Sequence, residues 1–367
     1  MNNMENKTEK RLIFAAIDQS LESNIVLPTE IKAKGKDMVS WGDRNNYPDY
    51  LLSLYNNVTS LRSIINGTID FVVGDGATIT HTLQGDAMND KGDTIIDLIK
   101  SLAKDYLIYG GMALQVVRGE DLETISALYY VDMRYLRSNK ENDVFYYSEE
   151  FGQKYVKTDK VVAYPKFIPG AQHPASIIFV KNVNTQVYPA PLYAASVKAC
   201  EIERNIDDYH LNSIHNGFSG SYIINFNNGV PSDAIKEEIE RDVNTKFAGA
   251  QNAGRIVLSF NDSKDSQTTI QKAELQDFGE KYQALAKHSR QQIFTAFRAT
   301  PNLFGIPTET TGFSEQEFKE SFRLYNRTMV KPIQVLIADM FEKALGEKGV
   351  LSITPFTLDG AGEDNVR

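Results

Sequence analysis

The sequence predicts an α+β fold, and three observations support this prediction. Two long amphipathic helices, over residues 192–214 and 275–297, flank a short strand–helix–strand segment. Ahead of them, residues 122–188 consist of short runs rich in Val, Ile, Tyr and Phe, separated by Gly, Asn, Asp and Pro, which is typical of a small antiparallel β-domain or barrel. A last long helix with an internal proline follows over residues 314–346.

Composition limits the classes of function. The chain has 367 residues and a net charge of −9, which argues against a surface built to grip phosphates, because non-specific DNA binding depends on Lys and Arg contacts. An acidic protein can still let DNA slide along it. The single cysteine, Cys200, excludes an internal disulfide, and we expect it in the core. We find no secretory signal and no apolar run that could cross a bilayer, and predict no membrane partner.

The first helix is expected to begin at Pro48, because proline suits the first helical position. Its apolar residues recur at three- and four-residue steps, and Gly67 is expected to end it. Residues 69–79 then predict a strand that turns at Gly74 and Gly76.

A second helix is predicted from about Thr94 to Tyr109, ended by Gly110 and followed by a buried strand over residues 112–117. Trp41, just ahead of the first helix, could stack on a base, but a packing role is expected.

Capping residues and prolines also predict where the helices in the second half of the chain begin, end or bend. Ser232 is expected to cap the helix between the two strands of the central unit. The 275–297 helix should stop before Pro301. Ser314 and Glu317 form a predicted capping box for the last helix, in which Pro332 should introduce a kink.

No constellation of residues predicts catalysis. The five histidines show no metal-binding spacing, and the adjacent Asp207 and Asp208 point about 100° apart on a helix, so they cannot chelate one ion together. The Gly74–Gly76 turn lacks the third glycine and the Lys-Ser/Thr pair of a phosphate loop. We therefore expect no enzyme activity, no cofactor and no metal.

The order of these parts resembles the portal proteins of tailed bacteriophages. Short motifs that begin or end helices and form turns agree with that resemblance, in the expected order over about residues 40–345. They are Tyr109–Ala113, Val131–Arg134, Ala190–Tyr193, Phe218–Gly220, Phe247–Arg255, Ile293–Gly305 and Val330–Pro332. Three features depart from the family pattern: Arg255 stands where lysine is common, the chain after the last helix is short, and no Lys or Arg lies between Asn302 and Phe313.

The resemblance implies a division of the chain into the family's parts. These are an N-terminal arm (1–36), a wing with a β-domain (37–188), a first stem helix (189–216), a clip (217–272), a second stem helix (273–299), a tunnel loop (300–313), a kinked wing helix (314–346) and a short C-terminal tail without a developed crown (347–367).

It also implies a function. The expected assembly is a dodecameric ring at the capsid vertex, assembled in the host cytoplasm, through which double-stranded DNA passes. The expected partners are the large terminase subunit, the major capsid protein and a head–tail adaptor. Three groups of candidate site residues follow: Thr308, Glu309, Thr310 and Thr311 in the tunnel loop, Lys281, Lys287 and Arg290 on the channel side of the second stem helix, and Lys236, Glu237 and Glu240 on the partner surface of the clip.

The candidate site residues also have simpler structural explanations. The basic residues of the second stem helix could equally face solvent between subunits, and the tunnel-loop residues could form an ordinary surface loop. Two other classes of protein stay open: another structural protein of the phage head–tail region, and an enzyme with a dispersed active site. The size of the purified particle distinguishes a ring from either.

Overall fold

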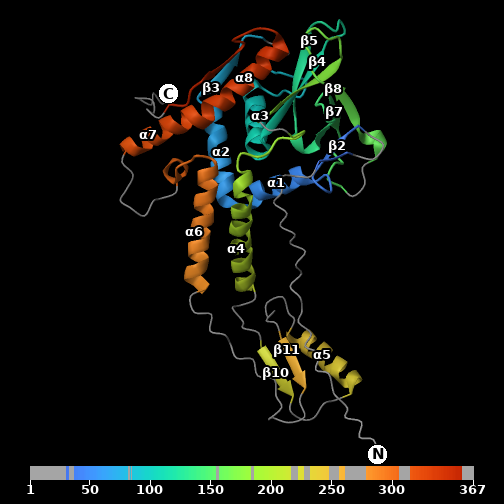
Figure 1. Ribbon diagram of the computed structural model, residues 1–367, viewed down its shortest axis with the longest axis vertical. Helices are drawn as coiled ribbons and strands as arrows, with labels where there is room; N and C mark the ends of the chain where they lie inside the picture. The colour runs from blue at the N-terminus through green and yellow to red at the C-terminus, as the bar shows by residue number, and fades with distance from the viewer. Residues whose placement is uncertain are drawn as a thin grey trace, which may run out of the picture.

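The computed structural model describes residues 30–32, 37–81, 83, 85–153, 157–182, 186–215, 222–226, 232–247, 256–260, 278–305 and 315–357. Among the described residues, an α/β body holds most of the helices and three sheets, and two long helices, α4 (Val197–His215) and α6 (Phe278–Ala296), run side by side out of it (Figure 1). A small unit of β10 (Tyr222–Phe226), α5 (Asp233–Phe247) and β11 (Ile256–Phe260) lies beyond their far ends. The described chain is thus a mixed helix-and-strand protein, as the sequence predicts.

The first predicted helix is two helices. α1 (Tyr47–Asn57) and α2 (Thr59–Val73) are separated by Val58, whose backbone is extended. The expectation that Gly67 ends this helix is wrong, because Gly67 lies inside α2. A Cβ at Gly67 would come within 2.8 Å of the Phe304 ring, so this glycine permits a close approach of another segment.

α3 (Ile95–Tyr109) matches its prediction closely. Thr94 caps it in a reciprocal box: the Asp97 backbone N–H donates to the Thr94 hydroxyl, and the Asp97 carboxylate accepts from the Thr94 N–H. The Thr94 hydroxyl also donates to the Asp97 carboxylate at 2.6 Å, and this hydrogen bond, followed by the one from the Thr94 N–H, holds the pKa of Asp97 below its usual value. Gly110 ends the helix in the left-handed conformation. Leu98, Ile99 and Leu102 of α3 are buried at the centre of the core.

The β-rich region is antiparallel, as predicted, but forms two separate sheets among the described residues, where a single barrel was one expectation. The three-stranded sheet has the order β5 (Ile125–Val131), β4 (Gly111–Arg118), β9 (Ala175–Lys181). The five-stranded sheet has the order β1 (Glu30–Lys32), β2 (Val39–Trp41), β6 (Leu136–Ser138), β7 (Val144–Tyr147), β8 (Val162–Pro165). Because β1 pairs with β2, part of the expected arm belongs to the body.

The strand predicted over residues 69–79 is correct only at its end. α2 continues to Val73, and β3 (Gly76–Ile79) pairs with β12 (Leu351–Thr354), a short strand after the last helix. Gly74 has φ +63°, and a Cβ there would meet the Thr354 carbonyl oxygen at 2.0 Å. The backbone carbonyl of β12 therefore occupies the space beside this turn, which is a structural turn against another strand.

The last long helix is interrupted where Pro332 predicts a kink. α7 (Glu315–Tyr325) passes into a π-helical segment, Asn326–Val330, before α8 (Lys331–Leu345) begins. Proline lacks an N–H and its ring crowds the carbonyl four residues earlier, so the α-helical pattern is displaced on the N-terminal side of Pro332. Ser314 lies outside the described residues, so the predicted capping box stays a prediction.

Trp41 is a packing residue. It is fully buried, and its ring stacks on that of Tyr188 at 4.6 Å and 5°. The Tyr188 hydroxyl donates to the Val39 carbonyl oxygen and accepts from the Ser138 N–H at 3.0 Å. Trp41 is therefore unavailable for stacking on a base, and this pair ties the segment that leads to α4 onto the five-stranded sheet.

Asp105 gives a pH-dependent prediction. Its carboxyl is fully buried in α3 and accepts a 2.9 Å hydrogen bond from the Met133 N–H, and burial followed by the nearby Asp132 raises its pKa well above the usual value. The folded state therefore keeps a proton that the unfolded chain, with an aspartate pKa of about 3.9, releases. Stability from this proton is complete below about pH 4 and is lost as the pH rises through the folded pKa.

Asp105→Asn should consequently be more stable than the original protein at pH 7, because the amide needs no proton to stay neutral in this buried position. The difference should shrink towards pH 4. Urea unfolding at several pH values measures it, and a stability difference that does not grow with pH would contradict the assignment.

Candidate functional site

The candidate site is the antiparallel helix pair α4 and α6, with the segments that join it to the body. Two contacts fix the alignment of the helices: the Ser196 hydroxyl donates to the Gln292 carbonyl oxygen at 3.0 Å, and the rings of Tyr209 and Tyr282 stack at 5.0 Å. The first of these two helices, α4, begins later than the predicted start at residue 192. A 3-10 turn, Ala194–Ser196, precedes α4, so residues 192–196 are not α-helical.

Glu203 joins α4 to the body. This residue is buried, and one carboxylate oxygen accepts hydrogen bonds from the Ser60 backbone N–H at 3.1 Å and from the Ser60 hydroxyl at 2.8 Å. Ser60 is the second residue of α2, and the N-cap residue Val58 supplies no side-chain cap. The carboxylate of one helix therefore caps the N-terminus of another, where the helix dipole also favours negative charge.

A second joint lies where the chain enters α4. The buried Tyr193 donates its hydroxyl to the Ile108 carbonyl oxygen at 3.1 Å, and its ring stacks on Phe297 at 5.6 Å. Nearby, the Tyr50 hydroxyl donates to Glu201 at 2.7 Å. The ends of both long helices that meet the body are thus fixed by buried aromatic and hydrogen-bonded contacts.

Aromatic residues hold the chain on both sides of residues 306–314. On the N-terminal side, Phe304 lies 6.0 Å from Phe294 and 5.6 Å from Tyr325 between ring centroids. On the C-terminal side, Phe322 packs edge-on against Phe71 of α2 at 5.2 Å. Both ends of this segment are therefore anchored on α2, α6 and α7, although the segment itself lies outside the described residues.

The predicted site residues fall into three positions. Thr308, Glu309, Thr310 and Thr311 lie outside the described residues. On α6, Lys287 and Arg290 are exposed, and Lys281 is part of the helix. On α5, Lys236 is half-buried and bonds Asp233 at 2.9 Å, Glu237 is exposed, and Glu240 is part of the helix. The two sets that the structure describes therefore lie on different elements, with α5 beyond the far end of α6 (Figure 1).

The small unit beyond α4 and α6 has the predicted β–α–β order. β10 and β11 pair in parallel, from Tyr222 opposite Ile256 to Phe226 opposite Phe260, and α5 connects them. The turn predicted over Phe247–Arg255 stays a prediction: Phe247 ends α5, and residues 248–255 lie outside the described residues.

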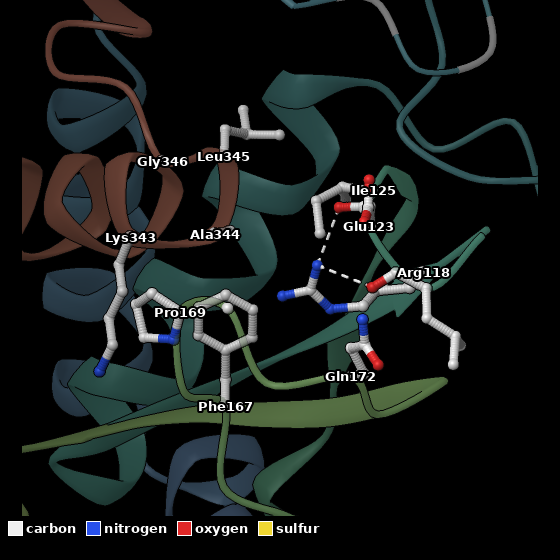
Figure 2. Close-up of a pocket in the computed structure, with 12 residues that line it drawn as sticks. Arg118, Glu123, Ile125, Phe167, Pro169, Gln172, Lys343, Ala344, Leu345 and Gly346 are labelled. Atoms are coloured by element: carbon white, nitrogen blue, oxygen red, sulfur yellow. Dashed lines mark hydrogen bonds between the residues drawn. The ribbon is translucent and has the colours of Figure 1, made fainter.

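A surface groove of about 380 Å³ lies between the β4–β5 hairpin, the segment after β8 and the end of α8 (Figure 2). The Arg118 guanidinium donates to the carbonyl oxygens of Leu122 and Glu123 at 3.3 and 2.9 Å and lies over the Phe167 ring. These contacts hold the hairpin against the neighbouring segment. The residues that line the groove form no acid–base–nucleophile set.

The described ranges offer few groups that could bind a metal ion or act as a nucleophile. They contain no group of His, Cys, Asp and Glu residues placed to hold a metal ion. Cys200 is buried, as expected, and burial raises the pKa of its thiol to about 12, so it is a poor nucleophile at neutral pH. None of the described helices has the length and apolar character needed to span a membrane.

Fold and site together define a protein with an α/β body and a helix pair that carries a small β–α–β unit away from it. The model of the phage portal protein family matches residues 87–358, which is most of the chain. The chain therefore belongs to the phage portal protein family. No curated protein matches the sequence.

Three solved structures are similar to this chain. A chain from the virion of a native gene transfer agent particle is similar with a TM-score of 0.54 and 18% identity, over 90% of this chain and 88% of that chain. A chain from the neck of an empty gene transfer agent particle has a TM-score of 0.50 and 17% identity, over 84% of each chain. The crystal structure of an HK97 family phage portal protein from Corynebacterium diphtheriae has a TM-score of 0.47 and 10% identity, over 82% of this chain and 92% of that chain.

Replacing Glu203 tests the joint between α4 and the body. Glu203→Ala removes the acceptor of two hydrogen bonds and leaves the buried Ser60 donors unsatisfied, so we expect a loss of about 2–3 kcal/mol. Asn205→Ala, at an exposed position on the same helix, should change stability by less than about 0.5 kcal/mol. Urea unfolding at one protein concentration compares them, and equal midpoints for the two variants would contradict a structural role for Glu203.

Proposed function

We propose that this chain forms the ring-shaped channel at a phage capsid vertex through which double-stranded DNA is packaged and later ejected. Family membership over residues 87–358 supports the proposal most directly. The antiparallel pair α4–α6, with the β–α–β unit at its far end, supplies the matching architecture. The proposed assembly is a dodecameric ring built from head-to-tail contacts, since such contacts close into a ring when the rotation between neighbours divides a full turn.

In this proposal α4 and α6 are the stem, β10–α5–β11 is the clip, and the body is the wing. Residues 300–313 form the tunnel loop, with Thr308, Glu309, Thr310 and Thr311 towards DNA. The aromatic anchors at Phe304 and Phe322 support this assignment, because they fix both ends of that loop to the rigid body.

The net charge of −9 fits a channel along which DNA moves. Each Lys or Arg that neutralises a phosphate releases counterions and makes binding tighter and more salt-dependent. An acidic wall avoids this and leaves the polymer free to slide. Basic residues are therefore expected at few places along the path.

The proposed partners follow from the proposed parts. The clip, with Lys236, Glu237 and Glu240 on α5, would meet the large terminase subunit during packaging and the head–tail adaptor afterwards. The wing would meet the major capsid protein. The protein would assemble in the host cytoplasm and remain at the capsid vertex of the virion.

Particle size and shape test the ring. The purified full-length chain should form a closed ring with a central channel, visible by negative-stain electron microscopy and consistent with a dodecamer by light scattering. A compact monomer at all protein and salt concentrations would overturn the proposal and favour an enzyme with a dispersed active site. A small assembly without a channel would favour another head–tail structural protein.

Deletion of Thr308–Thr311 tests the tunnel loop. Because Phe304 and Phe322 anchor the chain outside the deleted residues, ring assembly should be preserved, while packaging or retention of DNA should fall. Glu309→Gln should have little effect, since the loop is expected to act by steric contact and hydroxyl groups. Normal packaging and retention in rings of normal size would remove the proposed role of the loop.

A further inference from the structure

The surface groove beside the β4–β5 hairpin combines apolar and cationic side chains. Its volume of about 380 Å³ lies in the range of about 300–1,000 Å³ that is common for ligand sites. Three separate parts of the chain supply apolar residues to its wall (Figure 2): Leu122, Ile125, Phe167, Pro169, Ala344 and Leu345. The residue after Phe167, Ile168, is 57% exposed. The hairpin, the segment after β8 and the end of α8 thus converge on one depression.

Arg118 offers a pair of N–H groups in this groove. Its Nη1 donates to the carbonyl oxygens of Leu122 and Glu123, and no other described residue accepts a hydrogen bond from this guanidinium. The guanidinium carbon lies 5.8 Å from the centre of the Phe167 ring, which holds the group in place. Nε and Nη2 together form the edge that binds a carboxylate through two parallel hydrogen bonds.

The charge of the lining also favours a carboxylate. Lys343, at the end of α8, is exposed and adds a second positive charge to that of Arg118. Against them the lining holds the exposed side chain of Glu123. Because Arg118 is only half-exposed, solvent and salt would screen a carboxylate bound to it less than one on the open surface.

The turn of the hairpin is held in an unusual conformation beside the groove. Leu122 has φ +57°, a left-handed conformation that is rare for a residue with a bulky side chain. Its N–H donates to the Gly119 carbonyl oxygen at 2.9 Å, and Arg118 holds its own carbonyl oxygen. Strain of this kind persists where the surrounding contacts fix it, and it is frequent at ligand-binding sites.

The N-terminal arm carries the complementary chemistry. Residues 1–29 lie outside the described residues, and within them Leu12 to Ile17 form an apolar run that Asp18 follows directly. An apolar run that ends in a carboxylate matches a groove with apolar walls and an open guanidinium edge. The arm joins the body at β1, which pairs with β2 at the edge of the five-stranded sheet.

The distance between the arm and the groove is compatible with docking. β1 and β8 are four strand positions apart, which is at most about 20 Å at a spacing of about 4.8 Å. Phe167 is the second residue after β8. Asp18 precedes Glu30 by twelve residues, and a chain of that length extends to about 40 Å. A short tether also keeps a segment at an effective concentration of roughly millimolar order, which a separate partner lacks.

We propose that residues 12–18 dock in this groove of their own chain, with the Asp18 carboxylate on the Nε and Nη2 edge of Arg118. The apolar side chains of the run then cover Leu122 and Phe167. The last carbonyl groups of a helix have no partner inside it, so those at the end of α8 can accept hydrogen bonds from the docked backbone. Docking joins the hairpin, the segment after β8 and α8, and it does not depend on the proposed ring.

A disulfide bond in the full-length protein tests the docking. One variant carries Gln19→Cys and Gln172→Cys, which places one thiol beside Asp18 and the other at an exposed position of the groove. The control carries Gln19→Cys and Lys140→Cys, at an exposed position between β6 and β7 that is nearer to β1 in the sheet. Cys200 is buried and should not compete for oxidation.

Under mild oxidation the groove pair should form a disulfide within one chain at least about tenfold faster than the control pair, although an undirected tether would favour the nearer position. Mass spectrometry of unreduced peptides measures the rates, and circular dichroism with thermal melting checks that each variant folds. Equal rates for the two pairs, or a groove pair that stays reduced, would overturn the proposal. A disulfide between two chains would assign the groove to another copy and would also overturn it.

Substitution of Asp18 in the groove pair tests the contact with Arg118. Asp18→Asn removes the charge at nearly constant size and should slow the disulfide by about tenfold, whereas Asp18→Glu keeps the charge and should restore most of the rate. Arg118→Lys loses the paired N–H edge and should slow it as well. If Arg118→Lys does not fold, the two Asp18 variants decide. An unchanged rate in Asp18→Asn would overturn the contact.

The outcomes for this inference and for the proposed function are separate. A chain that forms no ring but cross-links rapidly in the groove keeps the inference and removes the proposed function. A chain that forms rings but cross-links equally in both pairs keeps the proposed function and removes the inference.

Discussion

The position of the long helices depends on one buried carboxylate. Glu203 accepts two hydrogen bonds from Ser60 at the start of α2, a helix whose own N-cap residue provides none. A buried carboxylate is costly unless it accepts hydrogen bonds, so the two bonds to its Oε1 favour one position of α4 against the body. Tyr193 and Ser196 then set the path into α4 and the alignment of α6. Everything beyond these joints is carried at the end of two helices.

A rigid connection of this kind is what a channel subunit requires. In Figure 1 the β–α–β unit lies beyond the far ends of α4 and α6, and the described part of the body lies at the other ends of these helices. The aromatic contacts around Phe304 also hold the helix pair to the body, because they join α2, α6 and α7 at one point. Apolar and hydrogen-bonded contacts fix the geometry of the single subunit.

Local signals in the sequence predicted the elements well and the long-range contacts poorly. Thr94 and Gly110 mark both ends of α3 because capping depends on residues close in the chain. Gly67 misled the prediction because its missing side chain makes room for Phe304, which is far away in sequence. Glu203 could not be identified as the joint, since its partner Ser60 lies 143 residues away. The resemblance to portal proteins worked because it depended on the order of many parts.

The contacts that hold the helix pair are buried, whereas many of the charged side chains of α4 and α6 are exposed. The joints of the helix pair are built from buried aromatic rings and hydrogen bonds, whereas Asp207, Asp208, Lys287 and Arg290 all lie on exposed parts of α4 and α6. Buried contacts are little affected by salt, while exposed charges are screened by it and act mainly on association. The shape of the subunit therefore depends mainly on contacts that salt affects little.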